Sequence, residues 1–514
     1  MLTQQAAIAA NRFGLGARPR DAAAIGSDPK GWLEEQVASA KRSTPAQANP
    51  PESAQVLQKL RDLEVVRQVA AQARANSAQP APQPAGQPKK AATAGSGAAP
   101  ASPGIGADAI KQFGQFSREH YIDQVNDRHR RAIESEQPFI ERLVQFWSNH
   151  FAVSADKALV APLVGLYEQE AIRPHVTGNF NALLLAVERH PAMNIYLDNT
   201  TSMGANSTAA SLARSRGREL GLNENLAREI LELHTLGVDG GYTQHDVTEF
   251  AKVITGWSIG GAVGPGARGA VKPANGGNAQ RARSPFGDGG KPGEFYFRTA
   301  MHEPGDKVVL GKTYKESGVA EGEQVLAWLA RSAATAKHLA TKLARHFVAD
   351  DPPEALVARL AETYLKHDGE LAPVYRELIR ADECWRQPLA KYKTPNDFVI
   401  STFRALDHVP DNLQQITGFL NELGQRPFTP GSPAGWPDTA ASWDGGDALL
   451  KRIEWSGAVG KRVGGMAGKG FDVEQLASSV MGPVSDATLA GIRGAADSGQ
   501  AFALLISAPE FQRR

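Results

Sequence analysis

The chain has 514 residues, of which 42% are apolar and 22% are charged, and its formal net charge is +1, a composition ordinary for a globular protein. This charge balance gives no reason to expect a nucleic acid or an anionic membrane as partner. The single cysteine, Cys384, excludes an internal disulfide and any cysteine-based zinc or iron–sulfur site.

The first residues and the apolar runs bear on where the protein resides. Residues 1–14 contain no basic n-region, and their apolar run is too short for a secretory signal. No run of roughly 18 apolar residues predicts a transmembrane helix. We therefore expect a cytoplasmic protein without a transmembrane segment, or a periplasmic or exported one if a leader precedes this sequence.

The first part of the chain is predicted to be helical, with one interruption. Residues 76–106 are rich in Ala, Pro, Gln, Gly and Ser and contain almost no bulky apolar side chains, so we expect a disordered insertion there. Pro191 ends one helix, because the residue before a proline disfavours the α conformation, and a short helix is expected over 190–199. The other predicted helices are short ones at 4–12 and 28–41, followed by helices at about 52–75, 107–134, 137–150, 157–172 and 179–189.

Two adjoining helices are predicted near the middle of the chain, over residues 223–237 and 243–256. In the first, the spacing of Leu226, Ile230 and Leu233 places three apolar side chains on one face. Asn223 suits the N-cap and Gly237 the position after the helix, and Thr243 with Asp246 resembles a capping box. Together these features predict an αα-hairpin.

The second half of the chain is also predicted to be mainly helical. Residues 259–293 are rich in glycine and are expected to form a flexible flap. Residues 294–298 and 307–311 alternate weakly, and we expect them to pair as the only β-hairpin. Further helices are predicted at 319–331, 333–347, 352–366, 370–381, 394–406 and 497–506. The predicted fold is therefore mainly α: one large helical domain over 1–514, with a small β-hairpin and two low-complexity insertions.

The candidate site lies on the first central helix. Asn225, Glu229 and Glu232 fall on the flank opposite the apolar stripe, with Arg228 beside them. They could form a catalytic carboxylate cluster, or a metal site completed by a histidine from elsewhere. In the structural alternative, Arg228 forms a salt bridge with Glu232, and the other two hold neighbouring helix ends.

Histidines elsewhere in the chain could complete this site. His150 closes an aromatic helix and could act as a general base, although a helix-end or core histidine is the commoner role. His302 lies in a loop and, with Glu229, is the candidate ligand pair for a divalent metal. The string Gly435-Trp-Pro-Asp438 is interpreted as a turn packed by an aromatic ring, without a chemical role.

Several activities leave no trace in the sequence. It contains no Walker P-loop, no dinucleotide fingerprint after a strand, no Gly-x-Ser-x-Gly elbow and no EF-hand. Covalent c-type haem is excluded, because the Cys-x-x-Cys-His motif is absent. The central helix pair resembles a helix-turn-helix, but its second helix lacks the cluster of cations that major-groove binding requires, so no nucleic acid is expected.

A set of short strings spread along the chain resembles a bacterial family known only as domain of unknown function 1800. The resemblance implies a large bacterial protein, but the family has no established activity or catalytic residue to carry over. Some relatives look exported, which bears on localisation. The strings are Arg12-Phe-Gly-Leu-Gly16, Phe146-Trp-Ser-Asn-His-Phe151, Arg173-Pro-His175, His190-Pro-Ala-Met193, Tyr196-Leu-Asp-Asn199, Asn223-Glu-Asn-Leu-Ala-Arg-Glu229, Glu232-Leu-His-Thr-Leu-Gly237, Thr255-Gly-Trp257, residues 302–311 and Gly435-Trp-Pro-Asp438.

Two functions remain open at this point. The first is an enzyme-like protein whose buried site of carboxylates and histidine performs acid–base or metal-assisted hydrolysis on an unidentified small molecule. The second is a non-enzymatic interaction or assembly protein, with the insertions as contact surfaces for a protein partner and the charged cluster purely structural.

Overall fold

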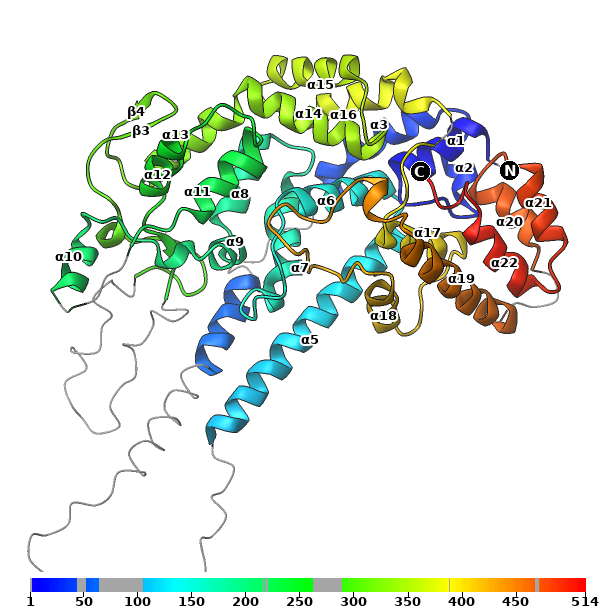
Figure 1. Cartoon of the computed structure of the whole chain (residues 1–514), viewed down its shortest axis with the longest axis horizontal. Helices are drawn as coiled ribbons and strands as arrows, with labels where there is room; N and C mark the ends of the chain where they lie inside the picture. The colour runs from blue at the N-terminus through cyan, green and yellow to red at the C-terminus, as the bar shows by residue number, and fades with distance from the viewer. Residues whose placement is uncertain are drawn as a thin grey trace, which may run out of the picture.

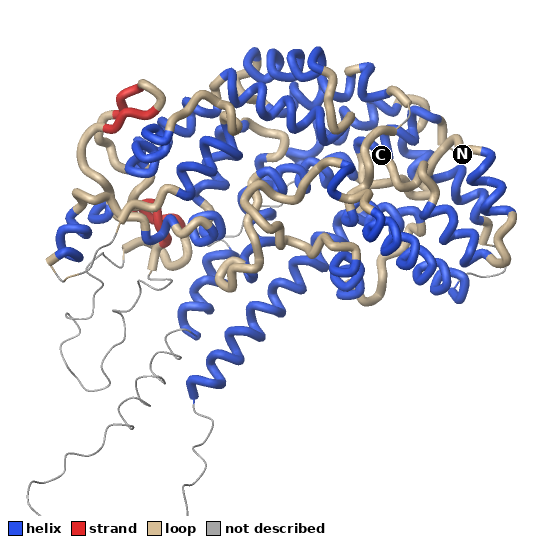
Figure 2. Tube along the Cα trace, in the orientation of Figure 1, coloured by secondary structure: helices blue, strands red, loops and turns tan. Residues whose placement is uncertain are grey.

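The computed structural model describes residues 2–43, 52–63, 105–215, 217, 221–261, 289–387, 389–466 and 471–514. Within these residues the protein is mainly helical, with two small antiparallel sheets of two strands each (Figures 1 and 2). The predicted fold class is confirmed. Most of the predicted insertion at 76–106, and residues 262–288 of the predicted flap, lie outside the described residues.

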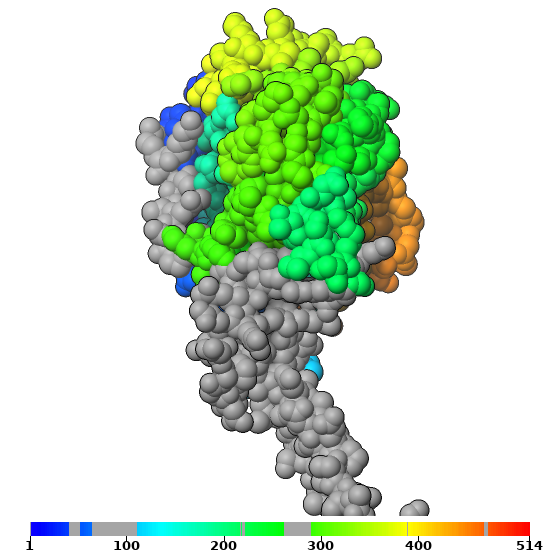
Figure 3. Space-filling model, turned by 90° about the vertical axis from the view of Figure 1, so that its left-hand side faces the viewer, coloured from blue at the N-terminus to red at the C-terminus, as the bar shows by residue number. Residues whose placement is uncertain are grey.

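The largest hydrophobic cluster is built by helices from the first three quarters of the chain. α14, α15, α16 and α3 pack in succession along one side (Figure 1), and α13 packs on α8. α10 (Thr208–Arg214) lies on a small separate cluster, and with α11–α14 it forms the face shown in green in Figure 3. The helices of the larger cluster are α3 (Pro29–Ser43), residues 52–63, α6 (Pro138–His150), α7 (Val164–Tyr167), α8 (Phe180–Arg189), α9 (Pro191–Tyr196), α11 (Asn225–Glu229), α12 (Gln244–Val253), α13 (Val319–Ala330), α14 (Ala333–Phe347), α15 (Glu354–Lys366) and α16 (Leu371–Arg380).

The second cluster joins the start of the chain to its last quarter, so both termini lie at the same end of the molecule (Figure 1). Within it, α19 and α22 pack so closely that a Cβ on Gly460 would lie 2.4 Å from the Gly499 carbonyl oxygen, which only glycine permits. The predicted helices over 394–406 and 497–506 are confirmed as α17 and α22, and α18–α21 are helices that the sequence analysis missed. The helices of this cluster are α1 (Gln4–Ile8), α2 (Asp21–Ile25), α17 (Pro395–Ala405), α18 (Gln414–Glu422), α19 (Gly446–Met466), α20 (Val473–Val480), α21 (Asp486–Arg493) and α22 (Ser498–Ser507).

One long helix and several short 3₁₀-helical and π-helical segments connect these parts. α5 (Ile105–Glu134) extends from the body (Figure 1) and contacts α17 and α18 as well as α6 and α7. The predicted helix over 157–172 is broken into η2, α7 and η3. The short segments are the 3₁₀ helices η2 (Ala161–Leu163), η4 (Arg173–His175), η5 (Asn199–Thr201), η8 (Thr299–Met301), η9 (Asp382–Trp385) and η10 (Ala440–Ser442), and the π-helical turns η1 (Ala9–Phe13), η3 (Glu168–Ile172) and η6 (Ile230–Thr235).

The predicted β-hairpin is wrong in its pairing. β2 (Phe295–Phe297) pairs with β1 (Trp257–Ile259), and β3 (Lys307–Val309) pairs with β4 (Lys312–Tyr314). Leu310 and Gly311 connect β3 to β4 with φ of 52° and 73°, the two left-handed residues that a tight hairpin turn requires. A partner only two residues away therefore outcompetes the more distant strand.

The central helix pair forms, but the first helix changes its winding. It begins as α11 and continues from Ile230 as the π-helical η6, where Thr235 Oγ1 donates to the Ile230 carbonyl oxygen at 2.6 Å. The predicted capping box of Thr243 and Asp246 at the start of α12 is confirmed. Among the described residues, no helix is both long and apolar enough to cross a membrane.

Candidate functional site

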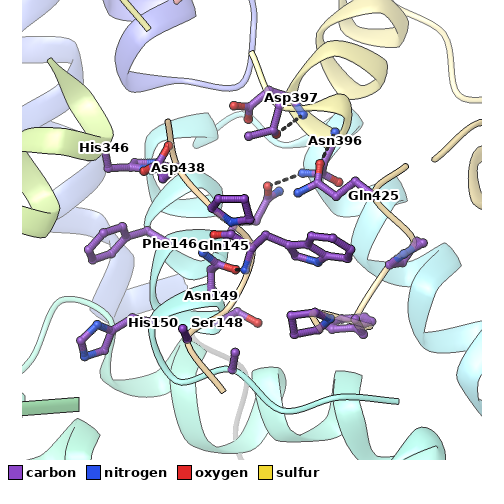
Figure 4. A pocket seen from close by; sticks show the side chains of 18 of the residues that line it. Gln145, Phe146, Ser148, Asn149, His150, His346, Asn396, Asp397, Gln425 and Asp438 are labelled. Carbon is purple, nitrogen blue, oxygen red and sulfur yellow. Dashed lines mark hydrogen bonds and ion pairs between the residues drawn. The ribbon is translucent and has the colours of Figure 1, made fainter. Parts of the chain in front are cut away.

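A pocket with a volume of about 330 Å³ lies where the two hydrophobic clusters meet. Its main walls are α6, the end of α14, the start of α17 and the irregular segment 425–439. Figure 4 shows His346 beside Asp438 on one wall, with Asn396 and Gln425 across the pocket. This volume falls in the lower range of small-molecule sites in proteins.

The Gly435-Trp-Pro-Asp438 string is held against α6 by one asparagine. Asn149 Nδ2 donates to the Trp436 carbonyl oxygen at 2.9 Å, and its Oδ1 accepts from the Trp436 backbone N–H at 2.7 Å. Gly435 has φ of 82°, and a Cβ there would lie 2.3 Å from the Asn149 carbonyl oxygen, so a side chain cannot be accommodated at this position. These contacts place Asp438 in the pocket wall.

Asp438 forms a dyad with His346. His346 Nδ1 lies 2.6 Å from Asp438 Oδ2. Burial lowers the pKa of His346 to about 4, so the ring is neutral at pH 7. Burial alone would raise the pKa of Asp438, but His346 and the cations Arg514 and Lys391 lower it by more, so the carboxyl is ionised. An ionised acceptor fixes the proton on Nδ1, which leaves Nε2 as a lone-pair acceptor without a partner among the described residues.

His346 belongs to a polar stripe along α14 that also contains His338 and Lys342. These residues are four apart, so they lie on the same side of the helix. Burial lowers the pKa of His338 to about 4 and that of Lys342 to about 8. His338 Nε2 donates to the Leu233 carbonyl oxygen at 3.1 Å, whereas Lys342 has no hydrogen bond or ion pair within the described part of the chain.

A buried ion network lies behind the dyad. Asp397 Oδ1 accepts from Arg142 Nη1 at 3.1 Å, and its Oδ2 accepts from Arg514 Nε at 2.8 Å. Arg514 also donates to the His346 carbonyl oxygen at 2.7 Å and lies 3.5 Å from Asp438. Burial would raise the pKa of Asp397, but these arginines lower it by more. The network holds both carboxylates ionised in fixed positions.

Of the predicted site residues, only His150 lines this pocket. Its Nε2 donates to the His234 carbonyl oxygen at 3.2 Å, and its Nδ1 has no partner among the described residues. Burial lowers the pKa of His150 well below its usual value. The ring is therefore neutral and fully buried.

The other central-helix residues do not line the pocket, although Arg228, Glu229 and Glu232 lie close enough for their charges to act on one another. Asn225 is exposed, and Arg228, Glu229 and Glu232 are half-buried. The expected salt bridge from Arg228 to Glu232 is wrong: Arg228 pairs with Glu224 one turn earlier, at 3.2 Å.

The two predicted carboxylates lie in different surroundings. Glu232 accepts from the hydroxyl of Tyr242 at 3.1 Å. Glu229 has no hydrogen bond within the described chain, and burial raises its pKa. The charge of Glu232 also raises the pKa of Glu229, whereas Arg228 lowers it, so these side chains remain neighbours on the helix.

His302 lies in a different environment, beneath the β3–β4 hairpin. Its Nε2 is 3.2 Å from Glu321 and 3.2 Å from Lys307 Nζ, and Lys307 pairs with Glu321 at 2.9 Å. Across the described residues, no group of three or more His, Cys, Asp or Glu side chains is placed to hold a metal ion, so the predicted metal pair of Glu229 and His302 belongs to no such group.

A buried histidine–carboxylate pair does occur near the middle of the chain, with partners that sequence reasoning missed. His234 Nδ1 lies 2.8 Å from Glu188 Oε1, and both side chains are fully buried. Sequence reasoning likewise missed Lys342, His346 and Asp438. The four-residue spacing on the 333–347 helix is the signal that could have revealed the first two, while Asp438 lies in an irregular segment without periodicity.

Comparison with models of known protein families assigns the chain to a family. The model described as "Protein of unknown function (DUF1800)" matches residues 8–513. No curated protein and no solved structure matches the chain. Because the family model covers nearly the whole sequence, the resemblance carried by the short strings is confirmed, and the chain belongs to the DUF1800 family.

Proposed function

We propose that this protein is an enzyme that performs acid–base chemistry, of the hydrolytic type, on a small molecule bound in the pocket between α6, α14 and residues 425–439. The observation that carries the proposal is the His346–Asp438 dyad: Nδ1 is 2.6 Å from an ionised carboxylate, and the ring lines the pocket. An imidazole oriented in this way is a common general base, because the carboxylate fixes its tautomer and stabilises the cation that forms.

In this mechanism Nε2 of His346 takes a proton from a water molecule or from a substrate hydroxyl. Asp438 then faces an imidazolium and stabilises it, while Arg142 and Arg514 keep the neighbouring Asp397 ionised and in place. The low pKa of His346, about 4, leaves the base unprotonated throughout the neutral range. The site thus differs from the central-helix cluster expected from the sequence, although its chemistry is of the same kind.

The test is hydrolysis of a panel of nitrophenyl esters, phosphate esters and anilides by the purified chain. We expect turnover of at least one class, with a loss of about 100-fold or more in His346→Gln, in line with the usual contribution of a general base. His367→Gln is the matched control, because His367 is exposed on a neighbouring helix end. Equal turnover by wild type and His346→Gln, or no turnover of any class, would contradict the proposal.

A further inference from the structure

We propose that the pocket binds a small anion, a carboxylate or a phosphate, with Lys342 Nζ as its counter-ion. This inference deepens the proposed function and rests on it in one respect, namely that the same pocket receives the substrate. Lys342 lines the pocket, is partly buried, and forms no hydrogen bond or ion pair with any described residue. An ammonium group that is partly withdrawn from water and has no partner is unfavourable, because charges inside proteins are as a rule paired.

The other cations of the pocket wall are already engaged. Arg142 donates to the Gly14 carbonyl oxygen at 2.6 Å and to Asp397 at 3.1 Å. Arg345 Nε donates to the Asp350 carbonyl oxygen at 3.0 Å. Arg345 thus has a hydrogen bond but no carboxylate partner, whereas the Lys342 side chain has neither among the described residues, so all three of its donors are left for a ligand.

Other lining cations have partners of their own. Arg426 lies 3.5 Å from Asp156, and Arg128 Nε lies 3.0 Å from Glu168. These pairs lie toward the side of the pocket formed by α5 and the start of the 425–439 segment. Each of these arginines already faces a carboxylate, whereas Lys342 forms no ion pair with a described residue.

The nearby acid cannot neutralise Lys342. Asp438 is the carboxylate whose charge acts most strongly on Lys342. The Asp438 oxygens, however, already lie 2.6 Å from His346, 3.4 Å from Lys391 and 3.5 Å from Arg514. The neighbouring histidines of the stripe are neutral, so they neither compensate nor compete for an anion. A ligand oxygen would complete the coordination of the ammonium group, which has three donors.

The rest of the lining indicates what the anion is attached to. Phe146, Trp436 and Pro437 provide apolar surface, and the volume of about 330 Å³ accommodates a ring as well as a charged group. We therefore infer an anion with a compact apolar or aromatic body. Benzoate and phenyl phosphate are suitable probes, and benzamide has the shape of benzoate without its charge.

Isothermal titration calorimetry of the full chain tests this inference. Wild type and Lys337→Met should bind benzoate or phenyl phosphate, whereas Lys342→Met should bind the same probe at least tenfold more weakly. Lys337 is the matched control because it lies on the same helix and is exposed. Which of the two probes binds more tightly assigns the headgroup as carboxylate or phosphate.

Two comparisons decide the outcome. Equal affinity of Lys342→Met and wild type, or no binding of either anion by wild type, would overturn the inference. Should Lys342→Met not fold, wild type alone is decisive, because binding of benzoate but not benzamide supports the inference and equal binding of both refutes it. His346→Gln separates the two proposals, since it should keep anion affinity while losing turnover.

Discussion

Buried histidines should make the protein sensitive to mild acid. Burial lowers the pKa of His129, His338 and His346 to about 4, from an ordinary value of 6.5. His129 is the simplest case: its side chain, on α5, is buried, and its Nδ1 lies 2.7 Å from the Val125 carbonyl oxygen. Each of these rings is neutral in the folded state at pH 5 but protonated in the unfolded chain.

The size of the effect follows from these pKa values. A folded-state pKa below the unfolded value means that the unfolded chain binds more protons, so stability is lost as the pH falls through 6.5 toward 4. A pH of 5 is about 1.5 units below the pKa of an unfolded histidine, and a difference of one pKa unit corresponds to about 1.4 kcal/mol of free energy. Lowering the pH from 7 to 5 should therefore cost about 2 kcal/mol per histidine and roughly 5 kcal/mol for the three together.

Denaturant unfolding followed by circular dichroism at pH 7, 6 and 5, at constant ionic strength, measures this loss. His129→Gln should reduce the decrease between pH 7 and 5 by about 2 kcal/mol, because the neutral amide has no proton to bind. His367→Gln, an exposed site, should leave the decrease unchanged. A free energy of unfolding that stays constant or rises over this range would refute the reasoning.

Three further outcomes are expected. Glu188→Ala should lower the free energy of unfolding by about 3 kcal/mol or more, because it leaves His234 without its partner at 2.8 Å. Glu188→Gln should lower it by less. Equal losses for the two variants in thermal or denaturant unfolding would contradict this reasoning. Gly435→Ala should lower the melting temperature and weaken anion binding, because the added Cβ would lie 2.3 Å from the Asn149 carbonyl oxygen. An unchanged melting temperature would show that the segment can move to accommodate the Cβ without loss of stability. Raising the pH from 7 to 9.5 should weaken benzoate binding more than tenfold, because Lys342, whose pKa is about 8, loses its charge. A constant affinity in calorimetry would show that another group binds the anion.

The helical body could be predicted from the sequence because local patterns determine it. The apolar spacing in 333–347 and the capping box of Thr243 and Asp246 depend on neighbours within a few residues, and both were recovered in the structure. The pairing of the strands was not, because β1 and β2 are separated by a long glycine-rich segment that carries no pairing signal.

The candidate site could not be predicted from the sequence, for a different reason. His346 and Asp438 are 92 residues apart in sequence, and Asp397 and Arg514 add two further distant segments. Nothing local brings these residues together, since their meeting depends on how the two hydrophobic clusters pack. The central helix does carry the dense set of charges that its sequence indicates, and these charges act on one another, but the helix does not border the pocket.

The change from α to π winding at Ile230 has a consequence for sequence variation. A π turn holds one residue more than an α turn of similar height, so deleting a single residue between Ile230 and Thr235 would restore ordinary α winding. The residues beyond the deletion would keep their orientation, because the extra residue is accommodated within the π turn itself. His234 lies inside this segment, so its position, rather than that of the residues after Thr235, would change. A change of length here would therefore be felt first at the buried His234–Glu188 pair.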